Sequence, residues 1–474
     1  MFLLLFLRKF LKITILKINL SIFAVSINHV IFKIMLLDFT IKNFLSFQNE
    51  VSLNMLATKT VKEIESLDEE YINTWTLSET DIRVLRTSAI YGANGSGKSN
   101  LITAMSYFKD LVLHSVVNES LIRNSQNLYY ALSPTGKDTP ISMQIIFTDD
   151  DVKYRYGFEI HDGKVLSEWL FSQNMSESSK ESYCFKRENE SIKINSKTYK
   201  GTKSIISRTR TNALFISTCA DYNVQTAMRI REWFRIKFNV ISGLDDTSIY
   251  TANCYMHDKE MHNKILDFIK LIDLGIEDIN IEKIVDNNNH TDELTQNTNQ
   301  NNKQINRLDI KSKHAVYKDN NIVGYTEMPF KMESLGTNKL FALLGPWFDT
   351  LKNGGVLIVD EYGASLHTQL SLKLINLFHS KINLNGAQLI ICTHDTNLLR
   401  RDLLRRDQIW FVEKDKSGSS DLYSLVEYKV NQATSVRNDA SFEKDYLLGK
   451  YGAIPYFGNI EKFINDYGKE EQIH

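Results

Sequence analysis

The residues with the clearest chemical potential form a glycine-rich stretch in the first quarter of the sequence. Residues 92–99 read GANGSGKS and fit the pattern G-x-x-x-x-G-K-[ST], with an apolar run before them and helical spacing after them. Glycines let such a loop aim its backbone N–H groups at phosphate oxygens, and the following helix N-terminus favours negative charge. We therefore predict a polyphosphate-binding loop formed by Gly92, Asn94, Gly95, Ser96, Gly97, Lys98, Ser99 and Asn100.

A pair of acidic residues at the end of an apolar run is the second group with suitable chemistry. Residues 356–361 read VLIVDE, which predicts a buried strand that ends in two carboxylates. Beside a bound polyphosphate, Lys98 is expected to reach the β and γ phosphates, and Ser99 and Asp360 to hold Mg²⁺. Glu361 is expected to orient or deprotonate an attacking water. An acidic strand end is common by itself, so its pairing with the glycine loop favours the catalytic interpretation.

Two further motifs stand in a fixed order around the acidic strand. Residues 333–339 read ESLGTNK at the head of a predicted helix, and residues 390–395 read IICTHD at the end of a predicted strand. Positions 98 and 360 are 262 residues apart, so a large insertion separates the loop from the carboxylates. This order resembles the ABC/SMC/OLD branch of ATPases. In isolation, Ser334 would be an ordinary helix N-cap and His394 a polar strand end.

The resemblance implies an α/β fold: a P-loop NTPase of the ABC/SMC-head type, with a mixed sheet, an antiparallel β lobe and an inserted helical subdomain. ATP and Mg²⁺ are the implied ligands. Ser334 and Gly336 would face the γ-phosphate held by the opposite protomer of a dimer, residues 365–367 would run along the dimer interface, and His394 would be a catalytic residue that senses the γ-phosphate. GTP is disfavoured because residues 338–341 read NKLF and lack the aspartate of an N-K-x-D element.

The likeness is strongest to the stand-alone anti-phage ATPases typified by RloA and by AriA of the PARIS system. It covers Met35 to about Asn459 and includes residues 410–414 (WFVEK) and 446–455 (YLLGKYGAIP). It implies a cytoplasmic sensor or regulatory ATPase of an abortive-infection system, a homodimer or higher homo-oligomer, acting with a separate effector that is a nuclease or toxin. The alternatives are an ATP-gated scaffold with negligible turnover and a DNA-associated ATPase of the SMC/RecF kind.

The sequence departs from the family pattern in two places. Its signature reads ESLGTNK where transporters carry LSGGQ, and the glutamine of the magnesium-sensing loop has only Gln144 as a candidate.

Bulk composition limits the classes of partner. The 474 residues are 43% hydrophobic and 24% charged with a formal net charge of -1, so nucleic acid could be bound only through local patches. The four cysteines lack a C-x-x-C pair, which argues against zinc and disulfides and favours a reducing cytosol. Two basic clusters keep nucleic acid open as a partner: Arg229, Arg231, Arg235 and Lys237, and then Arg400, Arg401, Arg405 and Arg406.

Four segments are expected along the chain. Residues 1–34 are apolar and basic, and their lysines interrupt them too often for a membrane span. We interpret them as a mis-assigned start before Met35, with a membrane-surface anchor as the alternative, and expect no membrane partner. Residues 35–216 are expected to form an ATPase N-terminal lobe, 217–330 a mainly helical insert with an Asn-rich surface loop at 286–306, and 331–474 a C-terminal lobe.

Overall fold

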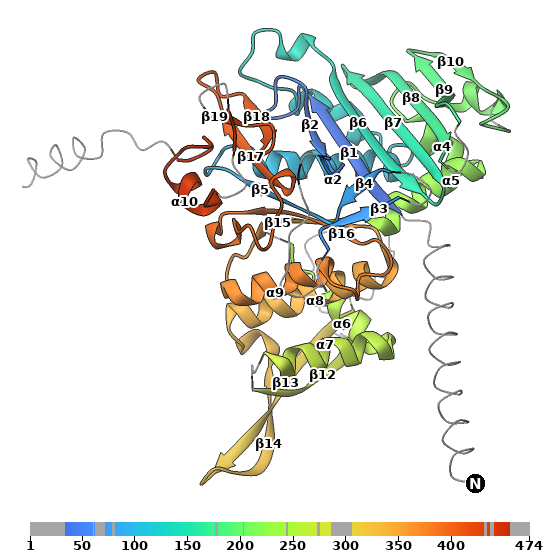
Figure 1. Ribbon diagram of the computed structural model, residues 1–474. Helices are drawn as coiled ribbons and strands as arrows, with labels where there is room; N and C mark the ends of the chain where they lie inside the picture. Colours follow the sequence, from blue (N-terminus) through green and yellow to red (C-terminus); the bar gives the residue numbers. More distant parts are fainter. Residues whose placement is uncertain are drawn as a thin grey trace, which may run out of the picture.

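Two β-sheets organise the chain (Figure 1). The computed structural model describes residues 34–59, 61, 72–77, 81–175, 179–201, 203–242, 245–272, 275–285, 306–430, 434–436 and 440–455. The predictions for residues 1–33 and for residues 286–305 of the Asn-rich segment lie outside these residues.

The first sheet is mainly parallel and has the strand order β11-β15-β16-β5-β17-β18. Every neighbouring pair is parallel except β17 and β18. Strands β5 and β16 are buried at every position, as expected for parallel strands that are covered on both faces. The strands are β11 Phe238–Ile241, β15 Val356–Tyr362, β16 Gln388–Thr393, β5 Thr87–Tyr91, β17 Ile409–Lys414 and β18 Ser420–Ser424.

The second sheet is an antiparallel lobe with the order β10-β9-β8-β7-β6-β1-β2. Alternating apolar residues give its strands one buried face, as in β6, where every second side chain from Ile141 to Phe147 is buried. The strands are β1 Met35–Lys42, β2 Val51–Asn54, β6 Ile141–Asp149, β7 Val152–His161, β8 Lys164–Asn174, β9 Ser182–Glu188 and β10 Ser191–Ile194.

Helix α2, Lys98–His114, is packed against both sheets. On the antiparallel side, the Phe108 ring lies 5.8 Å from that of Phe39 and 4.9 Å from that of Phe158, centroid to centroid. On the parallel side, α2 shares one apolar cluster with Ile358 of β15. The helix that follows the glycine loop is therefore held between the two sheets.

A buried glutamine also joins the sheets. The side-chain oxygen of Gln388 accepts from the backbone N–H of Leu36 at 2.7 Å. Its amide nitrogen donates to the carbonyl of Leu36 at 3.1 Å and to that of Leu85 at 3.0 Å. A side chain of the parallel sheet thus satisfies backbone groups of the antiparallel lobe and of Leu85, at the end of a short separate strand.

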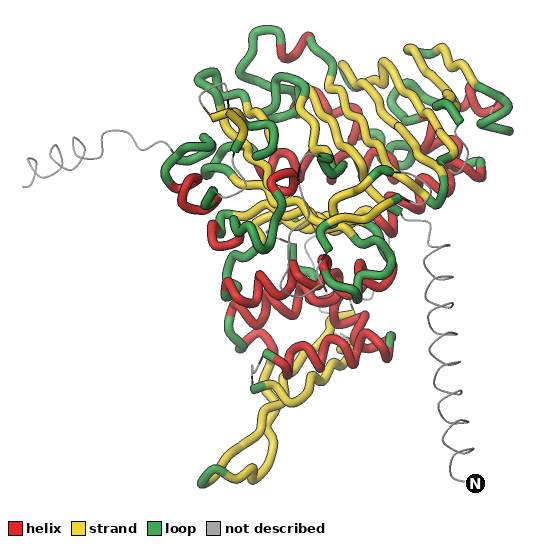
Figure 2. Tube along the Cα trace, viewed as in Figure 1, coloured by secondary structure: helices red, strands yellow, loops and turns green. Residues whose placement is uncertain are grey.

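Helices cover the opposite face of the parallel sheet (Figure 2). Alternate residues of the parallel strands, such as Leu357 and Val359, pack there against α8 and α9. None of the described helices is long and apolar enough to cross a membrane. α8 Leu335–Asn353 and α9 Thr368–His379 lie on the sheet, and α6 Ser248–His257 and α7 Lys259–Leu271 pack on α8.

The shorter elements lie at the edges and turns of this framework. They are β3 Thr74–Thr76, β4 Arg83–Leu85, β19 Lys429–Val430, β20 Thr434–Ser435, α3 Ser120–Arg123, α4 Phe215–Asp221, α5 Gln225–Glu232, the π-helix η4 Trp233–Lys237, α10 Phe442–Leu447, and the 3-10 turns η1 Asn124–Asn127, η2 Gly136–Asp138, η3 Lys203–Arg208, η5 Phe330–Met332, η6 Thr396–Leu398 and η7 Arg406–Gln408.

The fold class predicted from the sequence is confirmed: an α/β fold with a mixed sheet, an antiparallel β lobe and an inserted helical layer. The insert is less helical than predicted, because β12 Ile276–Val285, β13 Asn306–Lys318 and β14 Asn321–Pro329 form a three-stranded antiparallel sheet within it. β13 and β14 form a hairpin that projects beyond the helices (Figure 1). β12 and β13 pair across the Asn-rich segment, and short-range patterning does not show such a pairing.

Two elements depart from their local sequence pattern. Residues 225–238 have helical spacing throughout, but they are α-helical only to Glu232 and continue as the π-helix η4 before β11. Residues 83–91 form one largely apolar run, but the strand is interrupted at Arg86. The guanidinium of Arg86 donates to the carbonyls of Phe378 and His379, at 3.3 and 3.1 Å, so this residue serves a contact with the end of α9.

A buried polar cluster sits where β5 begins. A ring nitrogen of His379 lies 2.8 Å from the hydroxyl of Thr87, which accepts a 2.6 Å hydrogen bond from the amide of Gln408. Asn73 donates to the side-chain oxygen of Gln408 at 2.7 Å. Burial, with a smaller contribution from the nearby Arg86 guanidinium, lowers the pKa of His379 to about 3. The imidazole is therefore neutral in the folded protein at ordinary pH.

We predict that His379 makes the protein less stable in mild acid. Below its ordinary pKa of about 6.5, the unfolded chain binds a proton at His379 that the folded chain excludes, so the free energy of unfolding falls as the pH falls from 6.5 towards 3. Between pH 7 and pH 5 the parent should lose about 2 kcal/mol relative to His379→Gln, measured by urea unfolding. Parallel losses in the two proteins would contradict the prediction.

Candidate nucleotide-binding site

The glycine loop joins β5 to α2 at the carboxyl end of the parallel sheet. Lys98 is the first residue of α2, and only 6% of it is exposed. Its ammonium donates to the carbonyls of Gly92 at 2.8 Å and Ala93 at 3.0 Å. Burial lowers the pKa of Lys98, and the nearby Cys392, Asp360 and Glu361 oppose that effect. The lysine thus lies folded over its own loop, next to the carboxylates.

The backbone of Gly97 lies very close to two serine side chains. Its φ is +119°, and a Cβ at this position would come within 2.4 Å of the Ser420 hydroxyl and 2.7 Å of the Ser46 hydroxyl. These two serines bond each other at 2.8 Å, and Ser420 donates to the carbonyl of Ser96 at 2.5 Å. Asn100 donates to Ser46 at 2.8 Å. Only glycine fits here, because both the backbone angle and the space exclude a side chain.

The loop has unused hydrogen-bonding capacity. The hydroxyl of Ser96 is buried and has no hydrogen-bond partner. Asn94, Gly95 and Ser99 lie at the exposed surface of the loop, and Ser99 stands one residue into α2. A cradle closed to side chains, an orphaned hydroxyl and a lysine all suit a polyphosphate with its Mg²⁺. The residues present therefore fit both ligands.

The two carboxylates lie where β15 leaves the sheet. Asp360 is 7% exposed, whereas Glu361 is exposed and has a φ of +52°. The Asp360 carboxylate accepts from the backbone N–H of Glu361 at 2.9 Å. Asp360 also contributes to the electrostatic environment of Lys98, as does Glu361. The structure thus brings together the glycine loop and the predicted acidic pair.

His394 joins the same group from the neighbouring strand. It follows β16 directly, and Cys392 of that strand has its sulfur 3.9 Å from the carbonyl of Lys98. Burial first, and then the charge of Lys98, lower the pKa of His394, while Glu361 and Asp360 oppose them. A neutral imidazole at this place can donate one hydrogen bond towards a phosphate oxygen.

The predicted signature residues have contacts of their own. Ser334 is the N-cap of α8, and its hydroxyl accepts from the backbone N–H of Thr337 at 3.1 Å. The ordinary capping role considered for Ser334 is therefore present. Gly336 lies against the loop at 365–367, because a Cβ there would come within 2.8 Å of the carbonyl of Ser365. A role for both residues in a second protomer's site stays a prediction.

Comparison with known proteins decides the family. A family model described as "AAA domain, putative AbiEii toxin, Type IV TA system" matches residues 88–400, about two thirds of the chain. The chain belongs to this AAA family. It is a P-loop ATPase domain by family, and its glycine loop lies between a parallel strand and a helix. No curated protein matches the sequence.

Solved structures similar to this AAA domain include three SMC heads. One is a SmcHead bound to the C-winged helix domain of ScpA, with 16% identity, coverage of 82% of this chain and 97% of that chain, and a TM-score of 0.39. The SMC head domain from Thermotoga maritima has 14% identity, coverage of 82% and 98%, and a TM-score of 0.37. The Pyrococcus furiosus Smc head with an extended coiled coil, bound to the C-terminal domain of ScpA, has 15% identity, coverage of 84% and 98%, and a TM-score of 0.34.

Gln144 of the AAA domain is engaged inside the antiparallel sheet. Its side-chain oxygen accepts from Trp169 at 3.1 Å and from Arg155 at 3.3 Å. Arg155 lies in β7 and Trp169 in β8, so the Gln144 side chain links three strands of the antiparallel sheet.

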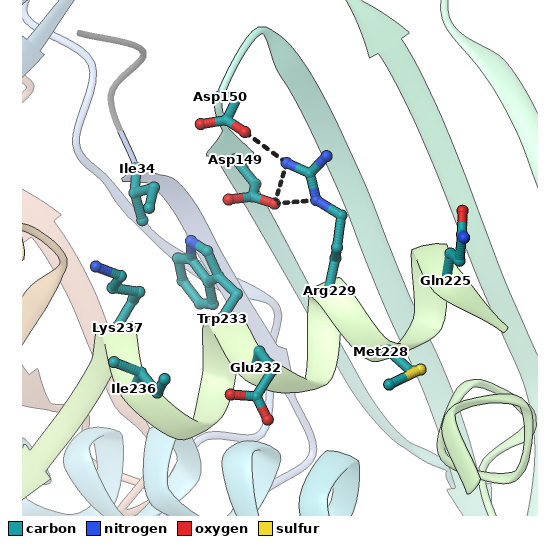
Figure 3. Close-up of a pocket in the computed structure, with 10 residues that line it drawn as sticks. All are labelled: Ile34, Asp149, Asp150, Gln225, Met228, Arg229, Glu232, Trp233, Ile236 and Lys237. Atoms are coloured by element: carbon teal, nitrogen blue, oxygen red, sulfur yellow. Dashed lines mark hydrogen bonds and ion pairs between the residues drawn. The ribbon is translucent and has the colours of Figure 1, made fainter. Parts of the chain in front are cut away.

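Most of the first basic cluster forms ion pairs with carboxylates of the same chain. Figure 3 shows the guanidinium of Arg229 against Asp149 and Asp150, at 2.8 and 2.7 Å. Arg235 pairs with Glu232 at 2.6 Å. A pocket of about 660 Å³ lies beside these groups. Its described lining residues include none of the predicted nucleotide-site residues; they are Ile34, Asp149, Asp150, Gln225, Met228, Arg229, Glu232, Trp233, Ile236 and Lys237.

The second basic cluster is matched in the same way. Arg400 pairs with Asp402 at 2.5 Å, and the buried Arg405 with Asp407 at 2.8 Å. Arg406 donates to the carbonyl of Val436. These pairs reduce the positive field that a nucleic acid would meet at either cluster.

Sequence reasoning missed the two serines that support Gly97. Ser46 lies in the turn after β1, and Ser420 begins β18, more than 300 residues later. Neither belongs to a motif, and a single serine in a turn is too common to single out. Their shared contact with the glycine loop depends on the pairing of distant segments.

We predict that Gly97→Ala weakens nucleotide binding and destabilises the AAA domain. Gly201→Ala is the matched control, because Gly201 has a φ of +77° and open space where a Cβ would be. Both changes should cost about 1 kcal/mol for the backbone angle. Gly97→Ala should cost a further ~1–3 kcal/mol because Ser420 and Ser46 must move. Urea unfolding and calorimetric titration with Mg²⁺-ATP measure the two effects, and equal results for both variants would refute the close-approach argument.

Proposed function

We propose that this chain binds ATP with Mg²⁺ and hydrolyses it at sites completed by a second copy of the same chain. The observation that carries the proposal is the convergence of Lys98, Asp360, Glu361 and His394 beside the glycine loop. These residues come from the ends of two adjacent parallel strands, β15 and β16, and from the helix after β5, the strand on the other side of β16. Parallel strands end at one edge of a sheet, which is where ligands of open α/β sheets bind.

Each residue has a task that its environment supports. The loop N–H groups and Lys98 hold the phosphates, and Lys98 exchanges its two backbone carbonyl partners for phosphate oxygens. In this proposal Ser99 and Asp360 hold Mg²⁺, which supplies charge neutralisation at the β and γ phosphates when bound. Glu361 is exposed at the strand end and accepts a proton from, or orients, the attacking water.

A dimer interface is supported by the surface around the signature. Leu335 and Met332, which flank Ser334, are 79% and 69% exposed. Large apolar side chains this exposed favour coverage by another protein surface. In the proposed dimer, Ser334 and Gly336 of one copy face the γ-phosphate bound by the other copy. Loss of that γ-phosphate removes an anion that both copies contact, and the dimer then opens.

The biological role that we propose is the sensor or regulatory ATPase of a cytoplasmic anti-phage system, acting with a separate effector protein. The motif order from the glycine loop to residues 446–455 supports this role, and the family description, which names a putative toxin of a toxin–antitoxin system, fits it.

The first test separates binding from turnover. Lys98→Ala should abolish Mg²⁺-ATP binding, because it removes the cation nearest the phosphates. Glu361→Gln should keep binding, accumulate an ATP-bound dimer and lower phosphate release by ~10²–10⁴-fold. Calorimetry, light scattering on a sizing column and a phosphate-release assay give the three readings.

Glu188→Gln is the matched control for that test, since Glu188 is an exposed glutamate at the end of β9. It should behave as the parent does. Equal and negligible turnover in the parent and in Glu361→Gln would support an ATP-gated scaffold in place of an enzyme.

The second test asks whether the two copies complete each other's sites. Lys98→Ala and Ser334→Ala should each be inactive alone, yet a mixture should regain about a quarter of parental turnover, because half of the random dimers are mixed and each of these has one intact site. Ser334→Ala also removes a helix cap worth about 1 kcal/mol, so its folding is checked by thermal unfolding. A mixture as inactive as its components would exclude the shared site.

A further inference from the structure

Glu361 holds a backbone conformation that needs support. Its φ of +52° lies in the left-handed region, where residues with a side chain are uncommon. The register between β15 and β16 shifts between Val359 and Tyr362, so a bulge at Asp360 and Glu361 turns the glutamate away from the regular sheet. Such a conformation persists only where the surrounding structure imposes it.

The neighbouring strand supplies a buried hydroxyl just after this bulge. Thr393 ends β16 and is completely buried. Its hydroxyl donates to the carbonyl of Tyr362 at 2.7 Å and accepts from the backbone N–H of Asp395 at 3.0 Å. One side chain therefore ties the residue after Glu361 to the backbone on the far side of His394.

The side chain of Tyr362 is also fixed. Its ring stacks on Trp347 of α8 at 5.6 Å with an interplanar angle of 18°, and its hydroxyl donates to the carbonyl of Ser371 in α9 at 2.7 Å. Trp347 in turn donates to the carbonyl of Leu374 at 3.1 Å. With the ring held by two helices and the carbonyl held by Thr393, the peptide that follows Glu361 has little freedom to rotate.

We propose that Thr393 is a positioning residue for Glu361 and links it to the γ-phosphate sensor. Thr393 and Asp395 flank His394, so a displacement of His394 by phosphate moves the hydroxyl that holds the carbonyl of Tyr362. The position of Glu361 is thereby coupled to the contact that His394 makes. This inference rests on the proposed hydrolysis of ATP, and it adds the regulation of that site.

The experiment replaces the hydroxyl by a methyl group of the same size. Thr393→Val should lower kcat for ATP by ~10–100-fold while KM and the calorimetric affinity for Mg²⁺-ATP stay within ~3-fold, because a misplaced base impairs the chemical step and leaves phosphate binding intact. Thr393→Ser keeps the O–H and should stay within ~3-fold of the parent in kcat. Thr218→Val is the matched control, since the buried hydroxyl of Thr218 donates to the carbonyl of Leu214 at 3.0 Å in α4, away from the site.

A double variant identifies the route of the effect. If Thr393 acts through Glu361, adding Thr393→Val to Glu361→Gln should lower turnover no further than Glu361→Gln alone. A further loss equal to that of the single variant would show that Thr393 acts independently and would overturn the inference. Parental kcat in a folded Thr393→Val protein would overturn it as well. A parent that binds ATP without turnover would instead refute the proposed function.

A second pair of variants covers the case in which Thr393→Val does not fold. Thr393→Cys replaces the hydroxyl by a weak S–H donor, whereas Thr393→Ser preserves it. Turnover should fall in the cysteine variant and persist in the serine variant, with both proteins showing the parental unfolding transition. Equal turnover in these two variants would contradict the positioning role.

Discussion

The site depends on the burial of α2 between the two sheets. Phe108 and its neighbours on that helix pack on the antiparallel lobe on one side and on β15 on the other. Hydrophobic burial on both sides leaves the helix no free direction in which to shift. Since the glycine loop ends where α2 begins, the same packing fixes Lys98 and Ser99 relative to the ends of β15 and β16.

The two ends of the parallel sheet are stabilised by different interactions. Where β5 begins, His379, Thr87 and Gln408 form a buried network of short hydrogen bonds, which is costly to disturb. Where the strands end, the backbone carries a bulge, a positive φ at Glu361 and a lysine bonded to its own loop. The scaffold therefore stays rigid at the start of the strands. At their ends, a ligand can replace the hydrogen-bond partners of the groups that would contact the nucleotide.

The sequence predicted the features that depend on short spacing. The loop at 92–99, the apolar strands around Asp360 and His394, and the helix that begins within ESLGTNK all appear as expected, because each is a local pattern of glycine, apolar and polar residues. Features that depend on distant segments were missed. Ser46 and Ser420 meet only after the two sheets assemble, and the hydroxyl of Thr393 finds its carbonyl only across a strand pair. The π-helix before β11 preserves helical spacing in the sequence, so its altered winding is not visible there.

The strand order of the parallel sheet also has a consequence for synthesis. β5 is complete at Tyr91, but its two neighbours, β16 and β17, begin at Gln388 and Ile409. At roughly 5–20 residues per second, the ribosome adds the 296 residues between Tyr91 and Gln388 over about 15–60 seconds. During that time an apolar strand has both hydrogen-bonding edges unpaired. The nascent chain therefore carries a core strand that only its last quarter can complete, and chaperones would have the longest access to the protein in this interval.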